Sequence, residues 1–167
     1  MKKQVIKQFF EFLEKKEKIE SPLLYKLVVS PETLTEKDLT VEGDLDLWGI
    51  DIKSLPKGLK VGRDLILEDC ILEYLPKGLV VGRSLYLINA ASLKKLPDNL
   101  TVGGSLHLDY TYVEDVPINL KVGRNLHVGF SKLLRNYGED LKKEIERNGG
   151  YVEGEVWGRQ DEESTEY

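Results

Sequence analysis

Cysteine and histidine are scarce in this 167-residue sequence, which contains one cysteine and two histidines. A single cysteine cannot form an internal disulfide, and two imidazoles are too few for a structural zinc site of the ordinary four-ligand type. The composition therefore indicates neither a disulfide-stapled extracellular domain nor a zinc-stabilised fold. We expect no cofactor.

Long apolar runs are also missing, so no segment is predicted to cross a membrane. The first twenty residues contain four glutamates where a signal peptide would keep an uncharged core, and we therefore expect a cytoplasmic protein. The net charge of -5 belongs to residues 134–167, which hold ten acidic and five basic residues. Because the rest of the chain is nearly neutral, it lacks the clustered Lys and Arg of a nucleic-acid binder, and no nucleic-acid partner is expected.

The middle of the sequence contains a repeat of about twenty residues. Five L-x-V pairs begin at positions 39, 59, 79, 100 and 120, so their spacing is 20, 20, 21 and 20 residues. Four residues after each Val comes an L-x-L pair, written L-x-V in its last copy. The one extra residue lies between Leu87 and Leu93, where a single coil is expected to bulge outward.

Stacking explains why such a short unit is repeated. Twenty residues cannot bury their few leucines alone, but stacked units share a continuous apolar core. The pattern therefore predicts a mainly β fold, a parallel β-solenoid of about five coils over residues 39–133. Alternation in L-x-L places both leucines inward and the middle residue outward.

Two corners of the coil are predicted from residue types that recur at equivalent positions of the repeats. A straight strand from Val to L-x-L would drive Arg63, Arg83 and Arg124 into the core, so the chain must turn at the glycines that precede them. Positions 58, 78, 99 and 119 are Gly, Gly, Asn and Asn, which tolerate the left-handed backbone region. A proline two residues earlier disfavours a helix there.

The pattern L-x-L-x-x-(Cys, Thr or Ser)-x-(Leu or Val), seen in LILEDCIL, LHLDYTYV and LHVGFSKL, resembles a leucine-rich repeat. The LPxxL step resembles the short repeats of bacterial effector proteins, and L-x-V-G-(G/R)-(D/S/N)-L-x-L is similar to repeat proteins encoded by bacteriophages and their hosts. The resemblance covers about residues 39–133. It implies a leucine-rich-repeat-like solenoid and an origin in a phage, or in a bacterium that carries phage genes, with action inside the bacterial cytoplasm.

Both flanks of the repeats are predicted to act as caps, because a solenoid exposes the edges of its first and last coils. KQVIKQFFEFLEKKEKI spaces its apolar residues as an amphipathic helix, so residues 1–38 are expected to form a helical N-terminal cap. Residues 134–159 are expected to contain a helix in EDLKKEIERNGG and a closing strand in YVEGEVW. The acidic tail at 160–167 has nothing to bury and is expected to be disordered.

Motifs for chemistry are few. The glycine-containing phrases lack the Lys and the helix of a phosphate-binding loop, and no nucleophile stands out beside a base. His107 and His127 are expected one coil apart, roughly 4.8 Å between their Cα atoms, next to Asp109. Because further metal ligands are missing, an exposed ladder of unlike residues is favoured over a metal site. We predict no catalytic residue, no metal and no enzyme activity.

The outward positions of the repeats give the candidate site. They form an apolar and aromatic patch rimmed by acids, which is typical of a protein-binding surface. The alternative is that these side chains pack under the caps or on each other. The predicted partner-binding residues are Asp46, Trp48, Ile66, Tyr86, Ile88, His107, Tyr110, His127 and Phe130.

These patterns favour a non-enzymatic protein–protein interaction module, monomeric or weakly self-associating, whose partner is another protein. A phage-encoded protein that binds and inhibits a host protein is one version of this function. The first alternative is a structural or assembly component that self-associates through its solenoid ends. The second alternative is a small hydrolase or metal protein.

Overall fold

The computed structural model describes residues 22–159. Two compact units meet in the sequence between Leu39 and Thr40. The predicted amphipathic helix at residues 3–19 and the predicted disordered tail at 160–167 lie outside the described residues.

The N-terminal unit contains a short helix and two 3-10 turns: α2 (Leu23–Val28), η1 (Pro31–Thr33) and η2 (Glu36–Leu39). Asp38 links η2 to Lys26 of α2 and to Thr35. Its Oδ2 accepts hydrogen bonds from the Thr35 hydroxyl at 2.7 Å and the Thr35 N–H at 2.8 Å, and Lys26 Nζ lies 3.0 Å from both of its carboxylate oxygens. The Thr35 hydrogen bonds, with Lys26 alongside, lower the pKa of Asp38 to about 2.

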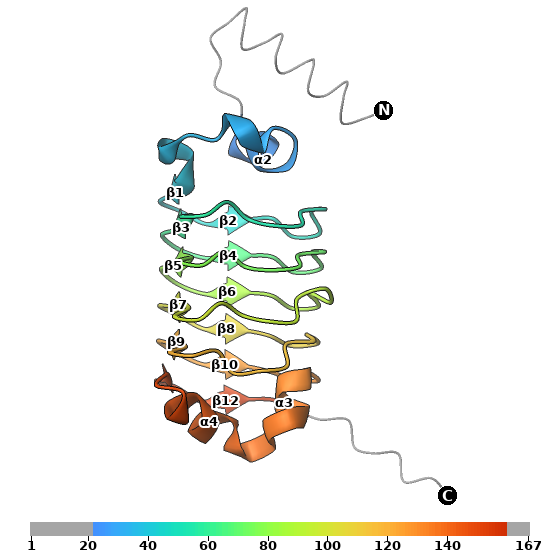
Figure 1. The fold of residues 1–167 in the computed structure, drawn as a ribbon, viewed down its shortest axis with the longest axis vertical. Coiled ribbons are helices and arrows are strands. Elements are labelled where there is room, and N and C mark those ends of the chain that lie inside the picture. The colour runs from blue at the N-terminus through green and yellow to red at the C-terminus, as the bar shows by residue number, and fades with distance from the viewer. Residues whose placement is uncertain (1–21, 160–167) are drawn as a thin grey trace, which may run out of the picture. The chain divides into compact units, whose positions relative to one another are not determined.

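The second unit is a parallel β-solenoid (Figure 1). Its first sheet contains β1 (Thr40–Val41), β3 (Lys60–Val61), β5 (Val80–Val81), β7 (Thr101–Val102), β9 (Lys121–Val122) and β11 (Tyr151–Val152). Its second sheet contains β2 (Leu45–Asp46), β4 (Leu65–Ile66), β6 (Leu85–Tyr86), β8 (Leu106–His107), β10 (Leu126–His127) and β12 (Val156–Trp157). The predicted fold is confirmed. The repeats from β1 to β10 complete about four turns, slightly fewer than the predicted five coils.

The core is the stack of repeated leucines and valines. In-register pairing places Leu65, Leu85, Leu106 and Leu126 in one column, and all four are fully buried. The last residue of each L-x-L pair is also buried, as is the Val of every L-x-V pair except the first. Each coil therefore contributes the same few apolar side chains to one continuous core.

Left-handed corners occur at two positions of the coil. One was predicted: Gly58, Gly78, Asn99 and Asn119 have φ of 79°, 77°, 60° and 56°. The other was not predicted, because the residues that occupy it share no chemical type. This second set is Gly49 (63°), Asp69 (56°), Asn89 (57°), Tyr110 (58°) and Phe130 (55°).

The turn between the L-x-V and L-x-L segments keeps arginine side chains out of the core, as predicted. Arg63 and Arg83 point outward, with side chains 55% and 56% exposed, and approach Asp44 and Asp64 of the preceding coil at 3.5 and 3.6 Å. The glycine at this turn does not adopt a left-handed φ. It is needed for space, since a Cβ on Gly82 would lie 2.1 Å from the carbonyl oxygen of Gly62.

The last coil differs from the others because it carries helices. After β10 the chain forms α3 (Lys132–Tyr137), η3 (Gly138–Asp140) and α4 (Leu141–Arg147), and only then β11 and β12. The helix in EDLKKEIERNGG is thus present as α4, with Leu141 and Ile145 fully buried, whereas α3 was not predicted. None of the helices in residues 22–159 has the length and hydropathy of a membrane-spanning segment.

Candidate functional site

The outward face of the second sheet carries the middle residues of the L-x-L pairs in one register column. Its members are Asp46, Ile66, Tyr86, His107 and His127, and Trp157 of β12 continues the same column. The rings of Tyr86 and His107 stack with centroids 4.4 Å apart, and those of His107 and His127 with centroids 4.3 Å apart. Parallel in-register strands explain this stack, because identical positions recur at the strand spacing of about 4.8 Å. We call Tyr86, His107 and His127 the ring column.

Trp157 extends this face, and the sequence interpretation missed it. Its register partner is His127, although 30 residues separate them instead of 20. A sequence signal does exist: the first coil reads VEGDL from Val41 and the last reads VEGEV from Val152, with Glu before Gly in both. Trp157 is 56% exposed.

The predicted site residues Asp46 and Trp48 lie at the other end of the sheet. Trp48 is 63% exposed, and its indole Nε1 donates a hydrogen bond to Asp69 Oδ2 at 3.0 Å. Hydrogen bonds from Asn89 and then Trp48 lower the pKa of Asp69. The structure thus places Asp46 and Trp48 on the same face as the histidines but several strands away from them.

An acidic rim borders this N-terminal end of the face. Burial first, and then the nearby carboxylates of Asp69 and Asp46, raise the pKa of Glu68. The carboxylates of Asp69 and Asp46 thus both disfavour the charged form of Glu68. This end of the face is therefore electronegative.

Tyr110 and Phe130 form a second ring pair, with centroids 5.0 Å apart, at the left-handed corner beyond the ring column. Large side chains rarely adopt this backbone region, and such outliers cluster at functional sites. Tyr110 and Phe130 both line each of two cavities. One, of about 570 Å³, is lined by Asn89, Ala91, Tyr110, Thr111, Tyr112, Phe130, Lys132, Arg135 and Asn136. The other, of about 520 Å³, is lined by Ile88, Asp109, Tyr110, His127, Gly129, Phe130, Trp157, Gly158 and Arg159.

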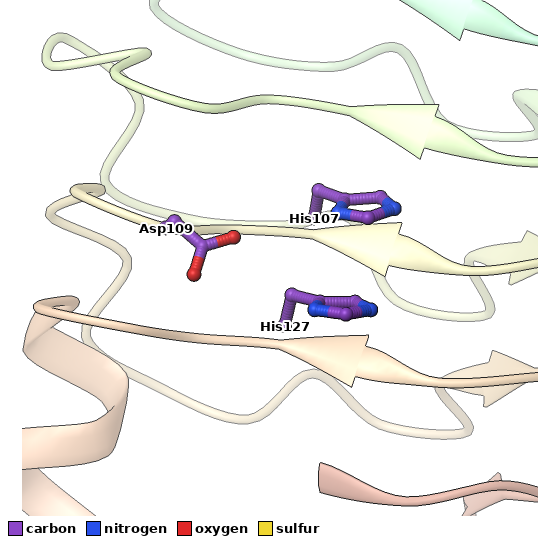
Figure 2. A group of neighbouring side chains, drawn as sticks. All are labelled: His107, Asp109 and His127. Carbon is purple, nitrogen blue, oxygen red and sulfur yellow. The ribbon is translucent and has the colours of Figure 1, made fainter. Parts of the chain in front are cut away.

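Two members of the ring column, His107 and His127, form with Asp109 a group of side chains of the types that can hold a metal ion (Figure 2). Ligand atoms of His107, Asp109 and His127 all lie within 4.8 Å of one another, and each residue is half-buried. Asp109 Oδ1 accepts a hydrogen bond from Gly129 N at 2.8 Å, which fixes the carboxylate. Burial and then His127 lower the pKa of His107 to about 4, against the opposing effect of Asp109.

Taken together, the structure assembles the ring column with Ile66 and Ile88 beside it, and it places Tyr110 and Phe130 at the adjoining corner. Ile66, Tyr86, Ile88 and Phe130 are partly covered by their neighbours, whereas Trp48, Tyr110 and Trp157 are mostly exposed. That a partner binds here stays a prediction, as do the absence of a catalytic residue and of a cofactor.

Comparisons of the chain with protein-family models, curated proteins and solved structures find no match. The parallel β-solenoid therefore rests on the structure, and the leucine-rich-repeat resemblance rests on the sequence pattern alone.

Proposed function

We propose that this protein is a non-enzymatic interaction module that binds another protein through the outward face of the second sheet. The observation that carries the proposal is the ring column, three rings stacked in register on an open sheet face. Stacked rings held by strands have little conformational freedom to lose on binding, and aromatic side chains commonly supply most of the energy of an interface.

The chemistry of the face indicates the kind of partner. Exposed Trp157 is paired with His127 at one end of the ring column, and exposed Trp48 follows the first strand of the same sheet, beside the acidic rim. An interface of this type favours a partner with an apolar or aromatic patch bordered by Lys or Arg, because opposite potentials speed association and exclude wrong partners.

The resemblance to repeat proteins of bacteriophages and their hosts suggests a more specific biological role for this interaction module. In that version a leucine-rich-repeat-like protein of phage origin acts in the bacterial cytoplasm and inhibits a host protein by occupying its surface. The constant leucines and glycines supply the scaffold, and the outward residues choose the target.

A comparison of three proteins in a pull-down from bacterial lysate tests the proposal. The test variant carries Tyr86→Asp, His107→Asp and His127→Asp. The matched control carries Val80→Asp, Thr101→Asp and Tyr151→Asp, which are exposed positions of the first sheet and add the same charge. Circular dichroism first establishes that all three are folded.

We expect the parent and the control to capture the same protein and the ring-column variant to lose it by at least about tenfold, which corresponds to 1.4 kcal/mol. Equal capture by the ring-column variant would place the binding surface elsewhere. Light scattering over a range of concentrations separates this function from the assembly alternative, in which the mass of the particle grows with concentration.

A further inference from the structure

We propose that His107, Asp109 and His127 bind a divalent transition-metal ion of the zinc type. This proposal does not depend on the protein-binding function. The three residues come from adjacent coils: His107 and Asp109 are two residues apart on one coil, and His127 is the register partner of His107 on the next. A strand spacing of about 4.8 Å and a two-residue spacing along the chain thus bring three ligands to one point on the sheet face.

The types of donor fit such an ion. Two imidazoles and one carboxylate suit Zn²⁺ and the neighbouring transition metals, whereas Mg²⁺ and Ca²⁺ prefer oxygen ligands. The sequence alone predicts no metal here, because a third and a fourth ligand are not evident in it. Three protein ligands are, however, the number found in sites that keep a position open for water or another exchangeable ligand.

The geometry needs one adjustment. The two imidazole planes are inclined by only 10°, and a metal must lie in the plane of each ring to which it is bound. Bonds of 2.0–2.1 Å also require ligand atoms about 3.4 Å apart, compared with separations of up to 4.8 Å here. Rotation of the rings about their Cβ–Cγ bonds brings the nitrogens together, and this torsion is soft in histidine.

Two further features favour the site. Asp109 uses Oδ1 to accept the hydrogen bond from Gly129, so the carboxylate is already oriented. Asp109 and His127 also line the cavity of about 520 Å³ that contains Tyr110 and Trp157. A ligand in the open position of the metal would therefore have space beside aromatic side chains.

Titration of the full-length, tag-free protein with ZnCl₂ by calorimetry tests the proposal, with Co²⁺ absorption as a second readout. We expect one equivalent of Zn²⁺ and a visible spectrum of Co²⁺ bound to nitrogen and oxygen. His127→Gln and Asp109→Asn should each weaken binding by at least about tenfold. Tyr86→Phe is the matched control, because it keeps the ring stacked on His107 and should bind within about twofold of the parent.

Less than a tenth of an equivalent of Zn²⁺ in the folded parent would overturn the proposal. Undiminished binding in both His127→Gln and Asp109→Asn would do the same, since the metal would then lie elsewhere. If His127→Gln does not fold, Asp109→Asn and the Co²⁺ spectrum decide. None of these measurements uses a protein partner, so their failure leaves the interaction proposal untouched.

Discussion

The glycine that follows the L-x-V pair in the second to fifth repeats lies close to the backbone of the preceding coil, and this predicts a large effect of a small substitution. Gly82→Ala would place a Cβ 2.1 Å from the carbonyl oxygen of Gly62, whereas such contacts are not made below 3.0 Å. The two coils would therefore have to separate by about 1 Å. That movement stretches the hydrogen bonds from Gly82 N to Val61 O, now 2.8 Å, and from Arg83 N to Arg63 O, now 3.0 Å.

The magnitude follows from three contributions. Two weakened hydrogen bonds cost about 1 kcal/mol each, overpacking costs about 1–3 kcal/mol, and the lower entropy of the unfolded Ala chain returns about 0.4–1 kcal/mol. We expect the free energy of unfolding to fall by about 3 kcal/mol. For a chain of 167 residues this lowers the Tm by about 10 °C.

Gly43→Ala is the control: Gly43 lies at the same turn of the first coil, one residue later than the position of Gly82. A Cβ there meets no atom within 4 Å, and neither glycine has a left-handed φ. It should leave stability unchanged or raise it by up to about 1 kcal/mol. Urea denaturation followed by circular dichroism measures both variants. A Gly82→Ala protein as stable as the parent would refute the idea that coil separation, rather than turn conformation, demands glycine here.

Three further predictions concern single side chains. Cys70 is 3% exposed and burial raises the pKa of its thiol, so it should react with a disulfide reagent at least about a hundredfold more slowly in the native protein than in denaturant; equal rates would contradict its burial. Ser131→Ala removes a buried hydroxyl that donates to Val128 O and accepts from Leu134 N, and should lower the free energy of unfolding by about 1–2 kcal/mol in urea denaturation, whereas Thr101→Ala at an exposed position should change it by less than about 0.5 kcal/mol. The pKa of Asp38 is lowered from 3.8 to about 2, so its carboxylate stabilises the N-terminal unit above about pH 4 and loses this effect as the pH falls toward 2; hydrogen exchange in residues 22–39 should show the loss in the parent and not in Asp38→Asn.

Much of the solenoid was predictable because its signals repeat in phase. Leucines at a constant spacing fix which residues pair between coils, and pairing then fixes which side chains face outward. The corner at Asn99 and Asn119 was predictable for the same reason, since Gly and Asn share tolerance of a left-handed φ. That His107 and His127 lie next to each other on adjacent coils was also predictable from the repeat period alone.

The second left-handed corner was not predictable, because the sheet imposes it against local preference. At this corner the N–H of Asn89 donates to Asp109 O and that of Tyr110 donates to Gly129 O, so the ladder between coils holds even an aromatic residue there. Helix α3 was not predicted, because the sequence marks it only by the lack of a Leu-Pro step after Ser131. The stacking of the rings and the hydrogen bond that orients Asp109 depend on side-chain packing, which a period does not specify.

Extra residues occur in two coils of the solenoid, and in both they follow the L-x-L pair. The single extra residue of the third coil lies between Leu87 and Leu93, and the ten extra residues before β11 and β12 lie between Val128 and Asn148, in the corresponding segment. After both, pairing resumes in register, as Leu85 with Leu106 and Leu126 with Val156. This segment is therefore a natural grafting position, where a foreign loop or helix pair can be inserted into any chosen coil while both sheets keep their phase.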